Sequence, residues 1–384
     1  MQRAIRTCLM RGGSSKGVFL HSRDLPAAGP LRDAVVLRIF GSPDARQIDG
    51  LGGADVLTSK MAIVGPPSVA GADVDYTFGQ VSFAGPVVDY GGNCGNISAG
   101  VGPFAVDEGL LPAAEPSATE RAVRIHNTNT GAILLATVPL GPRGAEVDGA
   151  FAIAGVPGTG ARIDLDFSET QGSVTGALLP SGCRRERLDV AGEGADAPEA
   201  VEATLLDAGQ PTVFVRATDL GLPAAPADAA EALQRDDSLL RRVERLRGAG
   251  AVRMGIVKRW EDSQVQSPYT PFVVAVGAPA PGEPWDLSAT CVFMQRVHKA
   301  YPVTGSVATV AAALLCGTVV HDCTRPPTGP VRIGHPSGVM EVHGQVSDGD
   351  PAPSLRRASI ARTARRLMDG NAYVPWSVWP ADSN

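Results

Sequence analysis

The stretch that decides the fold is GGNCGNISAGVGPFA at residues 91–105. A cluster of small polar residues opens it, and Ala, Gly, Val and Ile then occupy nearly every face of a helix expected from Gly95 to about Asp107. A helix that is apolar all round is buried. A second stretch of the same kind, VTGSVATVAAALL at residues 303–315, predicts another buried helix from Gly305 in the opposite half of the chain.

Short β segments separated by Gly and Pro account for most of the other structure. Strands are expected at residues 5–10, 122–125, 132–138, 172–179, 212–217, 272–276 and 338–342. Surface helices are expected at residues 31–40 and 229–246; the second carries an amphipathic stripe. Strands with one buried helix in each half predict an α+β fold of two similar domains. In each, a curled sheet surrounds a central helix.

The expected domains are residues 1–185, with Lys60 and the Cys94 helix, and residues 186–384, with the Thr304 helix. The C-terminal segment can return to the first domain. The Gly- and Ala-rich acidic stretch at residues 191–200 is the expected linker.

Composition excludes several classes of protein. With 44% hydrophobic and 19% charged residues, the 384-residue chain can form a core and is not intrinsically disordered. Its net charge of −6 offers no basic excess for a nucleic acid or an anionic membrane. We see no signal peptide and no apolar run of about 20 residues. The six cysteines are scattered, as is typical of free thiols in a reducing cytoplasm.

Cys94 is the sharpest candidate for chemistry. It lies where the first buried helix begins, and the unpaired N–H groups and positive dipole end of a helix favour a thiolate and bind carboxylates. Gly92 and Gly95 permit close approach of a ligand, and Asn93 and Asn96 supply further hydrogen bonds. A buried inert cysteine is the less favoured interpretation.

Two lysine motifs are further candidates. In LTSKMAIVG, Lys60 is followed by apolar residues, and burial of a lysine disfavours its charged form and can make it a general base. A strand lysine that extends its amine to water is the commoner case. In RGGSSKG at residues 11–17, Ser14, Ser15 and Lys16 form a donor-rich loop suited to an anionic oxygen, or simply a β-turn.

The histidines show no metal-ligand spacing, and no GxGxxG links a strand to a helix. His335, in the turn GHPSG, could contact a substrate carboxylate together with Ser337, and His298 lies just before the second buried helix. Either histidine could equally be structural.

Taken together, these motifs resemble the methylaconitate isomerase family, often called PrpF-like, which also contains 4-oxalomesaconate tautomerases and 3-methylitaconate Δ-isomerases. The resemblance covers nearly the whole chain. Its motifs are RGGSSKGVF at 11–19, LTSK at 57–60, GGNCGNISAGVGPFA at 91–105, VRIHNTNTG at 123–131, GVPGTGA at 155–161, GSVTGALLPSG at 172–182, HKAYPVTGS at 298–306, GHPSG at 334–338 and RTARRLM at 362–368.

The resemblance implies a diaminopimelate-epimerase-like fold of two pseudo-symmetric domains, with the active site between the starts of the two central helices. It implies that Lys60 is the principal base and acid. Cys94 is then a second proton carrier or part of the carboxylate cradle. The remaining cradle residues are expected to be Ser14, Ser15, Lys16, Asn93, Gly95, Asn96, Thr304, Gly305, Ser306 and His335.

The implied activity is a cofactor-independent proton transfer on a small unsaturated di- or tricarboxylic acid such as 2-methylaconitate. It is either a cis–trans isomerisation or a double-bond shift through a dienolate. No metal, nucleotide or flavin is required, and a homodimer is possible. The alternatives are a 4-oxalomesaconate tautomerase or 3-methylitaconate Δ-isomerase, an amino-acid racemase or epimerase, an accessory protein of an aconitase-like dehydratase, and a cysteine hydrolase. Thr304, at the position of the second epimerase thiol, argues against the racemase.

Overall fold

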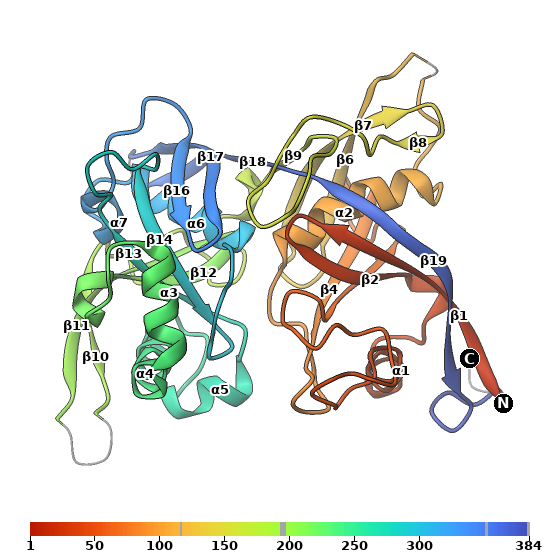
Figure 1. The fold of residues 1–384 in the computed structure, drawn as a ribbon, viewed down its shortest axis with the longest axis horizontal. Helices are drawn as coiled ribbons and strands as arrows, with labels where there is room; N and C mark the ends of the chain where they lie inside the picture. Colours follow the sequence, from red (N-terminus) through yellow and green to blue (C-terminus); the bar gives the residue numbers. More distant parts are fainter. Residues whose placement is uncertain (116, 193–196, 350–351, 382–384) are drawn as a thin grey trace. The chain divides into compact units, whose positions relative to one another are not determined.

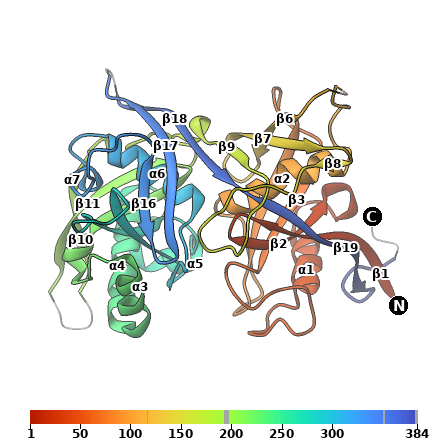
Figure 2. The same cartoon turned by 45° about the horizontal axis from the view of Figure 1, so that its top comes forward.

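The structure, a computed structural model, describes residues 1–115, 117–192, 197–349 and 352–381. The chain forms two compact units (Figures 1 and 2). Met1–Leu165 and Arg362–Asn384 make up the first unit, and Asp166–Ala361 makes up the second.

The first unit is built on a mixed sheet whose main strands follow the order β19–β1–β2–β3–β4–β6–β7. The strands of this unit are β1 (Gln2–Gly12), β2 (Ser15–His21), β3 (Lys60–Gly65), β4 (Val74–Val81), β5 (Val88–Asp89), β6 (Glu120–Asn127), β7 (Ile133–Gly141), β8 (Gly144–Ala145), β9 (Ile163–Asp166) and β19 (Ala364–Pro375). Its helices are α1 (Pro30–Phe40), α2 (Gly95–Asp107) and the 3-10 turn η1 (Ser22–Asp24).

The second unit has a sheet in the order β10–β11–β12–β13–β14–β16–β17. Its strands are β10 (Glu186–Val190), β11 (Glu199–Ala208), β12 (Gln210–Arg216), β13 (Phe272–Gly277), β14 (Leu287–Phe293), β15 (Arg296–Val297), β16 (Val331–His335), β17 (Gly338–Ser347) and β18 (Ser354–Arg362). Its helices are α3 (Pro226–Arg235), α4 (Asp237–Arg253), α5 (Ser263–Gln266), α6 (Val303–Leu314) and α7 (Val319–Asp322), with 3-10 turns η2 (Ser168–Thr170), η3 (Ala217–Leu220) and η4 (Trp260–Asp262).

The two sheets repeat one topology. In each, the successive pairings are antiparallel, antiparallel, parallel, antiparallel, parallel and antiparallel. Strands β1 to β7 of the first unit therefore correspond to strands β11 to β17 of the second. Helix α2, which follows β5, corresponds to helix α6, which follows β15. The predicted α+β fold with two similar, mostly antiparallel domains is confirmed.

Each sheet lies between helices. In the first unit, α2 packs on β1, β2, β3 and β7, and its residues from Gly95 to Ala105 are buried. The other face of β2 and β3 packs on α1 through an apolar cluster that includes Val18, Ile63 and Val36. Because both faces are covered, every residue of β3 is buried.

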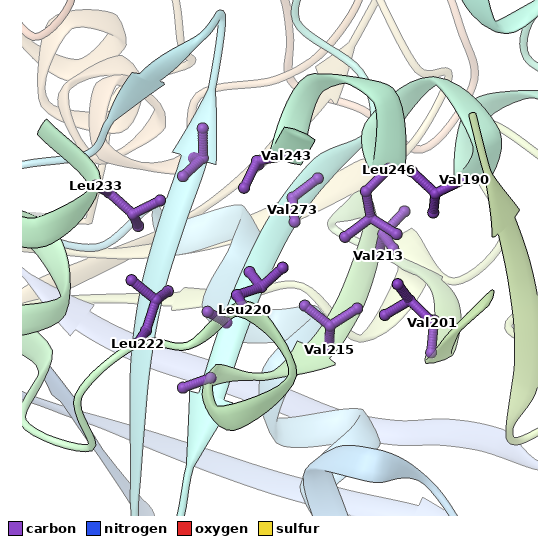
Figure 3. Packing of buried hydrophobic residues seen from close by; sticks show 14 of the residues in the cluster. Val190, Val201, Val213, Val215, Leu220, Leu222, Leu233, Val243, Leu246 and Val273 are labelled. Atoms are coloured by element: carbon purple, nitrogen blue, oxygen red, sulfur yellow. The ribbon is translucent and has the colours of Figure 1, made fainter. Parts of the chain in front are cut away.

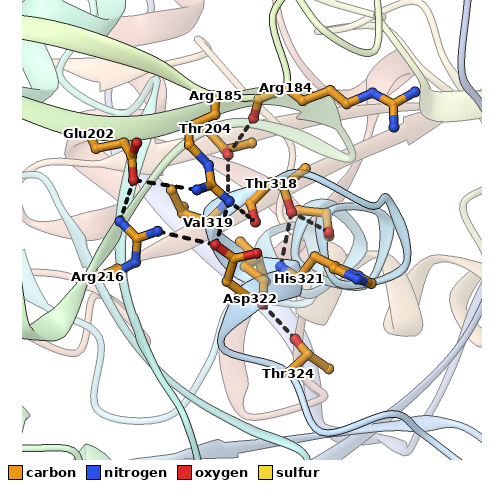
Figure 4. Close-up of polar contacts among 12 residues, drawn as sticks. Arg184, Arg185, Glu202, Thr204, Arg216, Thr318, Val319, His321, Asp322 and Thr324 are labelled. Carbon is orange, nitrogen blue, oxygen red and sulfur yellow. Dashed lines mark hydrogen bonds and ion pairs between the residues drawn. The ribbon is translucent and has the colours of Figure 1, made fainter.

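The second unit repeats this arrangement. Helix α6 packs on β11, β12 and β17. On the other face, Val213, Val273 and Leu246 belong to the cluster that α3 and α4 close (Figure 3). The short helix α7 is tied to the sheet by ion pairs of Asp322 with Arg185 and Arg216 (Figure 4). This contact fixes the chain that follows α6.

Two predicted elements differ from the structure. The helix expected at residues 229–246 is two helices, because the Asp236 carboxylate accepts a hydrogen bond from Leu239 N (3.0 Å) and starts α4. The strand expected at residues 172–179 is wrong. These residues form turns, in which the Asp207 carboxylate accepts hydrogen bonds from Val174 N and Thr175 N at 3.0 and 2.7 Å. Backbone groups bonded in this way cannot pair with a strand.

The division of the chain also differs from the predicted one. The first unit ends at Leu165 rather than at residue 185. As expected from the sequence, the C-terminal segment returns to the first unit, where its strand β19 pairs with β1. The stretch at residues 191–200 is not a linker between the units. It connects β10 and β11, two antiparallel strands of the second unit in which Val190 pairs with Glu199. Residues 193–196 of this stretch lie outside the described residues.

Candidate active site

Lys60 and Cys94 lie in direct contact in the first unit. Lys60 is the first residue of β3 and is 2% exposed. Its Nζ lies 3.4 Å from Cys94 Sγ and 5.4 Å from the centre of the Phe78 ring. A sulfur acceptor and an aromatic face therefore accompany the buried amine. The structure brings together the two residues predicted to be catalytic.

The loop before Lys60 is fixed by one buried glutamine. Gln47 Oε1 accepts hydrogen bonds from Ser59 Oγ at 2.7 Å and from Ala54 N at 2.8 Å. Its Nε2 donates to Ser42 Oγ at 3.0 Å. Since Ser59 immediately precedes Lys60, this glutamine sets where β3 begins.

Cys94 is the residue at which α2 starts. Its carbonyl accepts the first helical hydrogen bond, from Ser98 N at 2.9 Å, and its side chain makes no capping bond. Asn129 holds the chain that leads to it: its amide Nδ2 donates to Tyr90 O at 2.9 Å and to Phe78 O at 2.8 Å. The N–H groups of the first turn of α2, which follow Cys94 directly, have no partner within the helix.

The glycine-rich loop packs against the same helix start. Gly13 has φ +50°, and a Cβ there would lie 2.1 Å from Asn96 Oδ1. That oxygen accepts a hydrogen bond from Ser14 N at 3.2 Å. Ser15 begins β2 and is buried. Lys16 lies one residue further along the strand, so alternation directs its side chain to the face opposite that of Ser15. Lys16 is thus not brought to the Lys60–Cys94 pair.

Strand register places a row of residues across the sheet. Gly17 of β2 pairs with Lys60 of β3, Lys60 pairs with Gln80 of β4, and Gln80 pairs with Asp89 of β5. Residues paired in this way lie on one face of a sheet, here the face that α2 covers. Sequence analysis missed Gln80, since no motif surrounds it and its place follows only from the pairing of β3 with β4.

The predicted residues of the second unit gather at the start of α6. Thr304 is 1% exposed and is the second residue of that helix; Gly305 and Ser306 follow it. Ser306 Oγ donates to Val303 O at 2.7 Å. The His335 ring stacks on Tyr301, shortly before the helix, with ring centres 6.2 Å apart.

Two further contacts complete this end of the second unit. His335 Nδ1 accepts a hydrogen bond from Ser337 N at 3.2 Å, which leaves Nε2 as the protonated nitrogen of the neutral ring. His298 Nδ1 accepts from Ala300 N at 3.1 Å, and its ring lies beside Phe293. The second histidine candidate therefore contacts an aromatic side chain.

The repeated topology allows the position of Lys60 to be compared between the two units. Phe272 opens β13 and pairs with Thr212 of β12, as Lys60 opens β3 and pairs with Gly17 of β2. The Phe272 ring lies 5.6 Å from that of Phe293 and 5.3 Å from that of Tyr269. At the position of Lys60, the second unit has an aromatic cluster.

Among the described residues, no group of three or more His, Cys, Asp or Glu side chains is arranged to hold a metal ion. In the same part of the chain, we find no helix with the length and apolar character needed to cross a membrane.

Comparison with solved structures defines the class of fold. A hydroxyproline epimerase from Agrobacterium vitis is 12% identical and has a TM-score of 0.56, with 100% of this chain and 99% of that chain covered. The crystal structure of methylitaconate-delta-isomerase is 42% identical and has a TM-score of 0.78, with 98% of this chain and 97% of that chain covered. This chain therefore shares its fold with the hydroxyproline epimerase and with the isomerase.

The family model of the PrpF protein matches residues 2–375, so this chain belongs to the PrpF family. The 3-methylitaconate isomerase of Eubacterium barkeri is 43% identical, over 97% of this chain and 98% of the relative. The 4-oxalomesaconate tautomerase of Pseudomonas putida is 39% identical over 98% of both chains. The 2-methyl-aconitate isomerase of Shewanella oneidensis is 37% identical, over 95% of this chain and 96% of the relative. The protein is an enzyme of the isomerase class.

Proposed function

We propose that this isomerase moves a proton within a small unsaturated di- or tricarboxylic acid, with Lys60 and Cys94 as the proton-transferring pair. The observation that carries the proposal is the 3.4 Å contact between Lys60 Nζ and Cys94 Sγ, buried at the start of α2. Such a pair can both take and return a proton. The named isomerase relatives support a carboxylic acid as the substrate.

In the proposed reaction, the Lys60 amine is the base. It takes the proton from a carbon next to the double bond and becomes an ammonium, and the electron pair spreads over the double bond and the carboxylate as a dienolate. The ammonium returns the proton to the far end, which shifts the double bond, or to the same carbon after rotation, which gives cis–trans isomerisation. Cys94, hydrogen-bonded to Nζ, is the second proton carrier.

The negative charge of the dienolate needs donors that are already in place. In the first unit, the N–H groups at the start of α2 and the side chains of the glycine-rich loop can supply them. In the second unit, the start of α6 offers N–H groups of the same kind. In the first unit, the proposed carboxylate ligands are Ser14, Ser15, Asn93, Gly95 and Asn96. Lys16, and in the second unit Thr304, Gly305, Ser306 and His335, stay predictions from the motifs alone.

Proton NMR in D₂O tests the proposal. The purified protein is incubated separately with 3-methylitaconate, 2-methylaconitate and 4-oxalomesaconate, beside Lys60→Ala and, as a matched control, the exposed-lysine variant Lys258→Ala. We expect isomerisation with deuterium incorporation for one acid in the wild type and in Lys258→Ala, and none in Lys60→Ala. Turnover that survives Lys60→Ala would contradict the assigned base, and silence of the folded wild type with every acid would contradict the substrate class.

A two-thiol racemase is the weaker candidate, because Thr304 and Phe272 stand in the second unit where a second thiol and base are needed. Exchange of the α-proton of amino acids for deuterium would reverse this preference.

The proposed location is the cytoplasm, since all six cysteines are free, as is typical of a reducing compartment. A homodimer stays a prediction, which sedimentation of the purified protein can test.

A further inference from the structure

We propose that Gln80 is a substrate-binding residue whose Oε1 accepts a hydrogen bond from an O–H group of the substrate, either a protonated carboxyl group or an enol hydroxyl. The inference rests on the proposed function, because it places this O–H beside the Lys60–Cys94 pair. It deepens that function by stating in which protonation state the acid is bound.

The first observation is the environment of the Gln80 side chain. The residue is 1% exposed and lies opposite Lys60 in the β3–β4 register. Its Nε2 donates to Ser59 O at 3.0 Å. A carbonyl oxygen accepts only, so this bond fixes the orientation of the amide. The other amide atom, Oε1, is buried and has no hydrogen-bond partner among the described residues.

Two hydroxyl groups on the same face of the sheet are also buried without a hydrogen-bond partner among the described residues. Ser15 is two residues before Gly17 on β2, and Tyr76 is four residues before Gln80 on β4, so alternation directs both toward α2. Ser15 Oγ and Tyr76 Oη are buried without a hydrogen bond in the described part of the chain. Tyr76 lies near Cys94 and Ser98 at the start of α2.

An unpartnered buried polar group destabilises a protein, because it has lost its hydrogen bonds to water and gained none in return. Three such groups around one amine–thiol pair indicate a place where a ligand supplies the missing partners.

The second unit provides an internal comparison. Continuing the β13–β14 register by one residue pairs Phe272 with Phe293, which are the counterparts of Lys60 and Gln80. The two aromatic rings pack against each other there. The topology is therefore compatible with apolar side chains at both positions. A buried lysine and a buried glutamine in the first unit are not required by the fold, and a role in binding accounts for both.

The chemistry of the free atom identifies the ligand group. Oε1 of an amide only accepts hydrogen bonds, and so does an ionised carboxylate. The group that meets Gln80 must bring a hydrogen, which a carboxylic acid or an enol does. The Asp89 carboxyl, next in the row after Gln80, also disfavours an anionic oxygen at this place.

This protonated oxygen assists the reaction. When Lys60 takes the carbon proton, a neutral carboxyl or enol beside that carbon carries less negative charge than an ionised one. The O–H proton stays on its oxygen throughout, and the carbon proton alone moves to Nζ and back. Ser15 Oγ and Tyr76 Oη can donate to the neighbouring substrate oxygens.

Calorimetric titration of the full chain tests the proposal. The titrations are done at about pH 8, where free carboxyl groups are ionised. The two ligands are 3-methylitaconate, which has no enol form, and 4-oxalomesaconate, which has one. Each is titrated in two buffers of different protonation enthalpy. The proteins are the wild type, Gln80→Leu, Ser15→Ala and Thr77→Val. Thr77 lies on the same strand as Gln80 but on the other face, where it contacts Thr128 at the surface, so Thr77→Val should bind like the wild type.

We expect Gln80→Leu to bind an acid about tenfold more weakly, as for one lost hydrogen bond. Uptake of about one proton with 3-methylitaconate, reduced in Gln80→Leu, identifies a carboxyl O–H. Binding of 4-oxalomesaconate without uptake, weakened equally in Gln80→Leu, identifies an enol. Affinities within about twofold of the wild type for both acids, or no binding of either acid to the wild type, would overturn the proposal.

The result is separate from the proposed function, because each acid is first incubated with a trace of the wild type, so that any conversion is complete and the titration measures binding alone. A wild type that binds as expected but converts no acid contradicts the proposed isomerisation and leaves the Gln80 site standing. Ser15→Ala covers the case in which Gln80→Leu does not fold. This substitution removes only an unpartnered hydroxyl, so the melting temperature of the variant should not fall. The affinity of the variant for the acid should fall. An unchanged affinity in Ser15→Ala would overturn the shared subsite.

Discussion

Two buried tyrosines should respond oppositely to loss of their hydroxyl groups. Tyr76 and Tyr301 are each 0% exposed, and burial raises the pKa of both phenols well above the ordinary value. Tyr301 Oη shares a hydrogen bond of 2.7 Å with Thr309 Oγ1. Tyr76 Oη has no hydrogen bond among the described residues, although it lies near Ser98, whose Oγ donates to Asn93 Oδ1 or to the Cys94 carbonyl.

The magnitude follows from this difference. Tyr76→Phe removes a desolvated, unpartnered hydroxyl and should raise the free energy of unfolding by about 1 kcal/mol, the lower end of the penalty for such a group. For a unit of this size, that is an increase in melting temperature of roughly 2–4 °C. Tyr301→Phe loses a satisfied bond and should lower the free energy of unfolding by about 1 kcal/mol.

Scanning calorimetry of the ligand-free wild type and both variants measures the two effects, with urea unfolding as a second probe. A decrease in Tyr76→Phe as large as that in Tyr301→Phe would refute the reasoning, because it would mean that the Tyr76 hydroxyl already has a partner. When an acid is bound, Tyr76→Phe should no longer be more stable than the wild type. The ligand then pairs with the hydroxyl, and it should stabilise Tyr76→Phe less than the wild type.

Glu108 and the glycine-rich loop give two further predictions. Burial raises the pKa of Glu108, but hydrogen bonds from His21 and Arg366 outweigh it and lower the pKa to about 2, so this carboxylate stabilises the fold fully above about pH 4.5 and progressively less as the pH falls to about 2. Urea unfolding of Glu108→Gln should therefore show a flatter acid dependence than the wild type, and equal slopes would contradict it. Gly13→Ala should destabilise by more than about 1 kcal/mol, since φ is +50° and the new methyl meets α2. Gly109→Ala, with φ +64° and open space around it, is the matched control, and an equal loss in both variants would show that the contact does not matter.

Much of the fold follows from local sequence. The runs that became α2 and α6 are apolar on every face, which requires burial whatever surrounds them. The motif residues Lys60 and Cys94 carry their own signals, an amine within an apolar strand and a thiol at a helix start. Both signals depend only on neighbours along the chain, and for this reason they could be recognised without coordinates.

Other features depend on partners that are distant in the sequence. The turn at residues 172–179 has the composition of a strand, but the Asp207 carboxylate takes its backbone N–H groups. The C-terminal strand β19 belongs to the first unit because it pairs with β1. No local pattern shows either partner.

The sequence by itself determined the family motifs, the two buried helices and the identity of the amine and the thiol. Only the tertiary structure decided that Lys60 Nζ and Cys94 Sγ are in contact and that Gln80 lies opposite Lys60. It also decided that the side chain of Lys16 leaves β2 on the face opposite that of Ser15. The physical reason is strand register. A shift of one residue in the pairing of β3 with β4 would exchange the two faces, and that register is set by the packing of both faces against helices, not by the residues of either strand alone.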